Sequence, residues 1–231
     1  MLRLLLLLIL AGAGWFGWTL YQAREREGAL DLGAPPGLLD GRRLTGLTGD
    51  FRGCRAALER AGVRYTALAP VRAGHCGYAD GVRLSGGAAT VKLAPASLGT
   101  SCAVAASLAR WTWDAVQPAA VRHFGTTVVS IETFGSYSCR RLYGRREGGW
   151  SEHSTADAID IAGFRLADGR RITVAGDWRG EDAAARFLHD VRDGACRLFA
   201  TTLSPDYNAA HRDHLHLDQA ARGTAGWRAC R

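Results

Sequence analysis

The chain has 231 residues, of which 47% are hydrophobic and 22% are charged. This length suits one domain with accessory segments, and the composition is globular rather than disordered. The formal net charge is +7, yet Lys92 is the only lysine and no Lys/Arg run is interleaved with aromatic residues. Composition therefore argues against disorder and predicts no nucleic-acid partner.

Residues 1–22 form an apolar segment with a basic start. No charge occurs from Leu4 to Tyr21, a length near the lower limit for a membrane-spanning helix. The alternative is a cleavable signal peptide with a small-residue site at 11–14. Because the apolar run continues past that site, with aromatic residues suited to a membrane interface, we favour an uncleaved membrane anchor. Both alternatives predict that the rest of the chain is exported.

The segment after the anchor, residues 23–50, is rich in Gly and charge and contains a Pro-Pro pair, which predicts a linker. The main domain is then predicted over residues 51–231. All six cysteines lie in this domain without a C-x-x-C pair, so up to three disulfides in an oxidising compartment are expected. One pairing is predicted, Cys54 with Cys76, because they flank one short helix-turn-strand unit; the others stay open.

Three helices are predicted in the domain from apolar spacing, at residues 54–62, 102–124 (with a break or kink at Pro118) and 181–199. Four strands are predicted from alternation and β-branched residues, at 126–134, 158–166, 170–178 and 215–219. The second and third strands are expected to form a hairpin around the turn at 168–170. This order predicts an α+β fold, in which helices flank a small, mostly antiparallel sheet.

Two segments, SEHSTADAID and HRDHLHLD, carry metal-ligand chemistry. In the first, His153 and Asp160 lie seven residues apart, and alternation on a strand turns Asp160 away from its apolar neighbours. In the second, His214 and His216 lie two apart on a predicted strand and share one face. A catalytic zinc needs three such ligands and one open position. The segments supply three ligands and a spare histidine.

Residues around the second segment have supporting roles in this interpretation. Asp213 and Asp218 flank the histidines and are placed to orient the imidazoles by accepting their second N–H. His211 lies off the alternating face and is predicted at the rim of the site. Tyr207 and Asn208, in the loop before the strand, are predicted to reach a substrate.

The first segment resembles the S-x-H-x-x-G-x-A-x-D pattern of the metallopeptidases that include D-Ala-D-Ala carboxypeptidases, lysostaphin and the hedgehog signalling domain. Ser151, His153, Ala158 and Asp160 match this pattern, and Ala156 replaces its Gly. The DHLHLD segment is similar to the late D-H-x-H of penicillin-insensitive murein endopeptidases. More closely, the chain from about residue 51 resembles the bacterial extensin-like C-terminal domain family, through GSYSCR, SEHSTADAIDIAGF and DYNAAHRDHLHLD.

The resemblance implies a hedgehog/D-Ala-D-Ala peptidase-like fold with Zn²⁺ as cofactor. It implies that His153, Asp160 and His216 bind the zinc. His214 would lie beside the zinc-bound water nucleophile as general base or electrostatic stabiliser. Asp213 stands where the carboxypeptidase branch has a glutamate base, so both residues remain candidates, and we favour His214.

Two more positions follow from the resemblance. Arg140 in GSYSCR matches an arginine that steadies the substrate, and its fork suits a peptide carboxylate. Ala156 is expected to disfavour the positive φ that a glycine allows.

Together these features predict a zinc-dependent peptidase that acts on peptidoglycan stem or cross-link peptides. The N-terminal anchor is expected to hold it at the bacterial inner membrane, with the catalytic domain in the periplasm. The first alternative is a non-catalytic zinc-containing module that binds the cell wall or a protein, because a fold alone does not specify an activity. The second is a structural envelope domain without metal.

Overall fold

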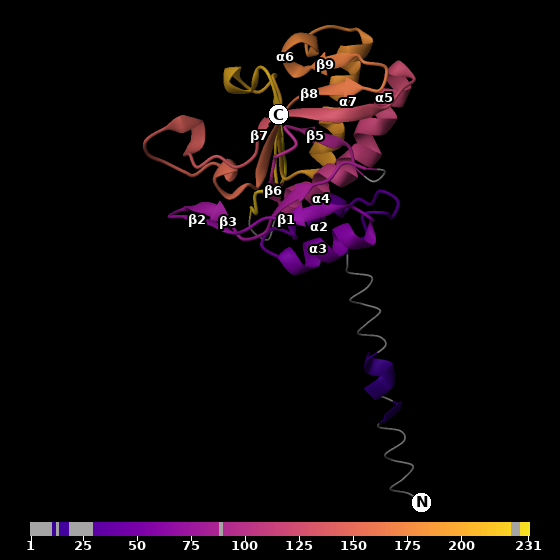
Figure 1. Ribbon diagram of the computed structural model, residues 1–231, viewed down its shortest axis with the longest axis vertical. Coiled ribbons are helices and arrows are strands. Elements are labelled where there is room, and N and C mark those ends of the chain that lie inside the picture. Colours follow the sequence, from indigo (N-terminus) through magenta and orange to yellow (C-terminus); the bar gives the residue numbers. More distant parts are fainter. Residues whose placement is uncertain (1–10, 13, 19–29, 88–89, 223–226) are drawn as a thin grey trace, which may run out of the picture. The chain divides into compact units, whose positions relative to one another are not determined.

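The computed structural model describes residues 11–12, 14–18, 30–87, 90–222 and 227–231 (Figure 1). The chain divides into two compact units, residues 1–31 and 32–231. In the first unit, residues 11–12 and 14–18 are helical, and the remainder of the predicted anchor lies outside the described residues. Among the residues described, no helix has the length and apolar character needed to cross a membrane.

The second unit contains a seven-stranded sheet, whose strands are β5 (Lys92–Ala94), β7 (Val128–Gly135), β8 (Ala158–Leu166), β9 (Arg171–Thr173), β10 (Thr201–Leu203), β11 (Leu215–Asp218) and β12 (Ala229–Cys230). Their order is β12-β10-β11-β8-β7-β5, and β9 pairs with β8. Only β5–β7 and β10–β12 are parallel among these pairs. Smaller antiparallel sheets join β1 (Tyr65–Ala67), β4 (Gly81–Leu84) and β6 (Thr100–Ser101), and β2 (Val71–Ala73) with β3 (Cys76–Tyr78).

The helices of this unit are α2 (Asp40–Thr45), α3 (Phe51–Arg60), α4 (Cys102–Trp111), α5 (Gln117–Phe124), α6 (Val174–Asp177) and α7 (Ala183–Leu198). Figure 1 shows α4, α5 and α7 along one side of the large sheet, whereas the loop after β7 projects away from them. Trp111, Phe164, Phe187 and Phe199 fill the core between these layers. The predicted combination of helices with mostly antiparallel sheets is confirmed.

The long helix predicted over 102–124 is present, with an irregularity at the proline. A π-helical turn over 112–116 joins α4 to α5, and Pro118 lies in the first turn of α5. Since proline has no N–H to donate, a wider turn just before it accommodates the missing hydrogen bond.

The predicted linker over 23–50 packs into the second unit from Leu32 onward. Leu32 and Leu44 are fully buried. Arg110, only 2% exposed, donates to the carbonyl oxygens of Leu32 and Ala34 (both 2.6 Å) and pairs with Asp40 at 3.1 Å. A buried guanidinium needs such acceptors, so a core residue of α4 holds this Gly- and Pro-containing stretch against the domain.

The predicted 158–166/170–178 hairpin is confirmed in its first part and wrong in its last. Strands β8 and β9 pair as expected, but β9 ends at Thr173 and residues 174–177 form α6. The Thr173 hydroxyl accepts from the Gly176 N–H at 3.2 Å, and the Asp177 carboxylate accepts from the Thr173 N–H at 2.7 Å. These local side-chain bonds favour a helix start over a longer strand.

Three disulfides are present, which confirms the expected oxidised framework, but the predicted Cys54–Cys76 pair is wrong. The pairs are Cys54–Cys102, Cys76–Cys139 and Cys196–Cys230. Cys54 lies on α3, whose buried face packs against α4, so its neighbour is Cys102. Cys76 lies on the β2–β3 hairpin and instead secures the loop after β7.

Candidate metal centre

Three of the predicted ligands meet at one point on the large sheet. Strands β8 and β11 pair antiparallel with Asp160 opposite His216, and a 3-10 helix over Glu152–Thr155 brings in His153. His153 Nε2 lies 3.2 Å from both Asp160 Oδ1 and His216 Nδ1, and the last two atoms are 3.0 Å apart. None of the three residues is more than 9% exposed.

The outer partners of the two imidazoles determine which ring nitrogens face inward without a proton when the rings are neutral, as a bound metal requires. His153 Nδ1 lies 2.6 Å from the Ser136 carbonyl oxygen, which can only accept, so Nδ1–H donates to it. His216 Nε2 lies 3.2 Å from Asp218 Oδ2 and donates to that carboxylate. The lone pairs of His153 Nε2 and His216 Nδ1 therefore converge with the Asp160 carboxylate, as in metal sites whose histidines are oriented from outside.

This donor set fits a zinc ion. Tetrahedral coordination with bonds of about 2.0–2.2 Å separates neighbouring ligand atoms by roughly 3.3 Å, close to the separations found here. Three electron-pair donors at such distances repel each other unless a cation or proton lies between them. Two imidazoles and one carboxylate, with ligand atoms all within 4.8 Å of one another, form a group that could hold a metal ion and leave a coordination position open.

The pKa values of His216 and Asp160 also indicate that a positive charge stabilises the centre. Burial alone lowers the pKa of His216, but hydrogen bonds to Asp160 and Asp218 outweigh it and raise that pKa to about 9. Burial alone raises the pKa of Asp160, yet its hydrogen bonds with His153 and His216 hold that pKa well below its usual range. In the metal-free protein, a proton on His216 occupies the electrostatic role of a metal ion.

His214 lies beside this centre. Its Nδ1 is 2.9 Å from Asp213 Oδ1, and its Nε2 is 3.5 Å from Asp160 Oδ1. The Asp213 carboxylate accepts from Nδ1–H, so the Nε2 lone pair faces the centre. The Phe134 ring packs against the imidazole in an edge-to-face arrangement, with centroids 5.9 Å apart.

A further histidine, His211, also belongs to the site, although the sequence placed it at the rim. It is 9% exposed, and its ring centroid lies 5.3 Å from that of His214 and 5.8 Å from that of His216. Burial and the neighbouring His216 and His214 lower its pKa to about 4, so it is neutral near pH 7. A turn places it there, since the His214 N–H donates to the His211 carbonyl; its three-residue spacing from His214 was the available signal.

A cleft of about 760 Å³ opens over the centre, and Arg140, Tyr207, His211 and His214 line it beside the three ligands. Asn208 and Asp213, also predicted as site residues, are not among the residues that line it. The Asn208 side chain accepts from the Ala210 N–H and from His211 Nδ1 at 2.8 Å. Asn208 and Asp213 therefore each orient a histidine that faces the cleft.

The wall that carries Arg140 is an exposed loop. Arg140 Nη2 lies 4.0 Å from Asp160 Oδ2, while its side chain is 45% exposed. The adjacent Cys139 is bonded to Cys76, and the Arg140 carbonyl accepts from the Ser151 N–H at 3.1 Å. These bonds hold the guanidinium beside the metal centre.

Comparison with known proteins agrees with the resemblance in the sequence motifs. Residues 52–231, more than three quarters of the chain, match the family described as extensin-like protein C-terminus. The chain belongs to this family. No curated protein and no solved structure matches it. The match begins one residue inside α3, so it covers the whole metal centre and every strand of the large sheet.

In this extensin-like domain, the expectation for Ala156 is wrong. Ala156 has a φ of +61° and ends the 3-10 helix that carries His153. Its N–H donates to the His153 carbonyl at 3.2 Å, and its own carbonyl accepts from the Ser101 N–H at 2.9 Å. Its methyl group is fully buried. Packing and hydrogen bonds on both sides outweigh the cost of about 1–2 kcal/mol of the left-handed conformation.

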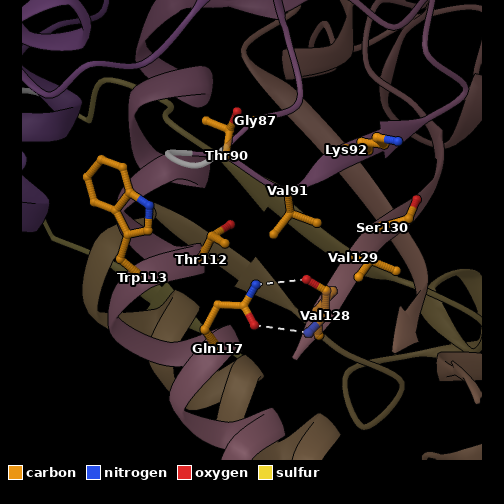
Figure 2. Close-up of a pocket in the computed structure, with 10 residues that line it drawn as sticks. All are labelled: Gly87, Thr90, Val91, Lys92, Thr112, Trp113, Gln117, Val128, Val129 and Ser130. Carbon is orange, nitrogen blue, oxygen red and sulfur yellow. Dashed lines mark hydrogen bonds between the residues drawn. The ribbon is translucent and has the colours of Figure 1, made fainter. Parts of the chain in front are cut away.

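A second cavity, of about 580 Å³, lies between α5 and the ends of β5 and β7. Figure 2 shows Gln117 facing Val128, and two hydrogen bonds of 2.8 and 2.9 Å join its amide to the Val128 carbonyl and N–H. Lys92 is the one charged residue among the described residues that line it. This cavity offers no metal-ligand set, unlike the cleft.

Proposed function

We propose that this protein is a zinc-dependent peptidase that acts on peptidoglycan stem or cross-link peptides. The observation that carries the proposal is the convergence of His153 Nε2, Asp160 Oδ1 and His216 Nδ1 at the floor of an open cleft. The peptidase-like spacing of these residues supports the reaction class. We also propose that β8 and β11 belong to a hedgehog/D-Ala-D-Ala peptidase-like fold, since paired strands supply two of the ligands.

Zinc, when bound, supplies a Lewis acid that makes water a nucleophile near neutral pH and polarises the scissile carbonyl. His153, Asp160 and His216 would hold it, and the Ser136 carbonyl and Asp218 keep the two imidazoles in the required tautomers. These outer partners matter because their loss typically costs 10–100-fold in metal affinity or activity.

His214 is the proposed general base. Its Nε2 faces the centre and its Nδ1–H is held by Asp213, so it takes a proton from the attacking water and delivers it to the departing amine. Asp213 contacts His214 and is not among the residues that line the cleft, which favours a positioning role over direct proton transfer. Asp213 thus orients the base His214, as a third group orients the base in other catalytic sites.

Arg140 and His211 are the proposed substrate contacts nearest the metal centre. The exposed guanidinium of Arg140 binds a peptide carboxylate with two parallel hydrogen bonds. Neutral His211 gives its Nδ1–H to Asn208 and so accepts a hydrogen bond from a substrate amide through Nε2. Tyr207, 43% exposed on the rim, is placed to contact the rest of the peptide.

We infer that the domain works in the bacterial periplasm, with residues 1–22 as an inner-membrane anchor. Three disulfides support an oxidising compartment. The apolar run from Leu4 to Tyr21 supports the anchor.

The test is cleavage of purified peptidoglycan by the full chain, purified in mild detergent with its disulfides formed. Products are identified by mass spectrometry with added zinc, with a chelator, and for His216→Ala. His123→Ala is the matched control, because this histidine pairs with Asp190 away from the cleft. New stem-peptide fragments that require zinc and His216 would establish the peptidase. Zinc retention without fragments would favour the non-catalytic binding module.

A further inference from the structure

Glu152 is a carboxylate of the cleft that the proposed mechanism does not use. It precedes the ligand His153 in the 3-10 helix, is half-buried, and lines the cleft. Among the described residues, no donor lies within hydrogen-bond distance of its carboxylate and no cation lies within 4.0 Å. Asp160 and Asp218, which line the same cleft, are both paired.

The positive groups that act on the Glu152 carboxylate belong to Arg222 and His216, and both are paired with Asp218. Arg222 Nη2 lies 3.8 Å from Asp218 Oδ1 and also donates to the Thr201 hydroxyl. His216 Nε2 lies 3.2 Å from Asp218 Oδ2. Asp218 and Asp157 are near enough to repel the Glu152 carboxylate. Within the described residues, this wall of the cleft therefore carries a partly desolvated carboxylate without a hydrogen-bond or ion-pair partner, which is costly unless the carboxyl binds a proton or a ligand supplies a cation.

We propose that Glu152 is a specificity-determining residue that binds a primary ammonium group of the substrate. This inference rests on the proposed peptidase function, whose substrate class it narrows. An ammonium is a compact charge with three donors and suits a single carboxylate in a half-buried site. Among the residues described, one group can hold a metal ion, and Glu152 is not part of it.

The cleft then presents opposite charges beside different ligands. A guanidinium, that of Arg140, lies beside Asp160, whereas the Glu152 carboxylate lies on the side of the Asp218–His216 pair. A substrate in the cleft is thus a peptide with both a carboxylate and an ammonium group. Stem peptides that contain a diamino acid have this chemistry.

The experiment compares a diamino-acid-containing stem peptide with the same peptide acetylated on both amines. The zinc-loaded full chain is assayed for kcat/KM by mass spectrometry and for Kd by calorimetry. We expect the native protein to prefer the free-amine peptide by about tenfold, the size of one charge-assisted hydrogen bond. Glu152→Gln abolishes this preference by weakening the free-amine peptide alone, and Glu152→Asp retains part of it.

The matched control is Glu147→Gln, which removes the same charge from an exposed position outside the cleft lining and should leave the preference intact. Zinc affinity is measured for each variant, and an unchanged value excludes an effect through His153. Acetylating one amine at a time then identifies which ammonium is bound.

The outcomes separate this inference from the proposed function. Cleavage in which Glu152→Gln weakens both peptides equally overturns the role of Glu152 and leaves the peptidase standing. Absence of cleavage, with ammonium-dependent binding that Glu152→Gln abolishes, supports the role of Glu152 and overturns the peptidase. Neither cleavage nor binding overturns both.

Discussion

The floor and the rim of the cleft differ in how their residues are held. The floor, formed by His153, Asp160 and His216, is at most 9% exposed and is positioned by strand pairing and by hydrogen bonds on both sides of each imidazole. The rim, represented by Tyr143 and Tyr207, is 55% and 43% exposed.

This difference separates chemistry from recognition. Ligands on paired strands keep their geometry without a substrate, whereas rim residues on loops adjust to one. Variants of the floor should therefore change metal binding and pH-dependent stability, while variants of the rim should change substrate affinity alone.

The largest effect is expected for Asp160→Asn, which keeps the shape of the side chain and removes its charge. Zinc affinity should fall more than about 100-fold, because loss of a ligand's hydrogen-bonding partner alone costs 10–100-fold. Competition with a chromophoric chelator measures it. Asp168→Asn, at the exposed turn between β8 and β9, is the control and should bind zinc normally. A loss below tenfold for Asp160→Asn would contradict the assigned ligand set.

The next effect tests how the rim is attached to the floor. Removing the Cys76–Cys139 disulfide with two serines should lower the free energy of unfolding by about 4 kcal/mol, since this bond closes a 63-residue span. Because Arg140 adjoins Cys139, KM should also rise, while zinc affinity stays unchanged.

The matched comparison removes Cys54–Cys102, which joins α3 to α4 away from the cleft lining. It should cost similar stability, measured by urea unfolding, without raising KM. An equal rise of KM in both variants would show that the disulfide acts through general stability and not through the Arg140 loop.

A third prediction concerns the pH dependence of the metal-free protein. The pKa of His216 is raised to about 9 in the fold, so its stabilising charge is fully present below pH 6.5 and is lost as pH rises through 9. The free energy of unfolding should drop by on the order of 3 kcal/mol across this window. His216→Gln should flatten the profile.

Zinc should reverse this trend, because binding releases the proton from His216 and therefore tightens as pH rises toward 9. His211 should affect stability at low pH. Its pKa is lowered to about 4, so protonation costs stability as pH falls from 6.5 toward 4. Thermal unfolding of the metal-free protein at a series of pH values would show a maximum near pH 6.5 if both assignments hold.

The smallest effect is expected for Tyr207→Phe on the rim. The Tyr207 phenol is exposed to water, so loss of its hydroxyl should raise KM roughly threefold at most, with unchanged kcat and melting temperature. A large loss of kcat would move Tyr207 from the rim to the reacting groups and break the distinction between the two regions.

The floor could be predicted from the sequence because strand periodicity acts locally. Alternation in AIDIAGF and LHLD places Asp160 and His216 on known faces, and the structure brings the two residues opposite each other. Candidate metal ligands with such spacing can be brought together in only a few ways. The position of His211 could not be predicted in this way, because it reaches the cleft through a turn rather than through strand alternation.

Features that depend on distant contacts could not be predicted in the same way. The spacing of Arg110 in the sequence is compatible with a position on the exposed surface of a helix. In the structure it lies in the core and donates to the carbonyl oxygens of Leu32 and Ala34. The disulfide partners likewise follow from helix packing, as Cys54 and Cys102 show. In each case a segment with weak local preferences is positioned by a group far away in the chain.

The Gln117 side chain affects how the large sheet can interact with other protein molecules in a crowded solution. Val128 precedes Ser130, where β7 begins to pair with β5, and among the described residues no strand pairs with this edge of β7 at Val128. Gln117 uses its amide to donate to and accept from that backbone, as a strand would. Open strand edges recruit other chains into aggregates. One side chain thus blocks this stretch of the β7 edge from pairing with another chain.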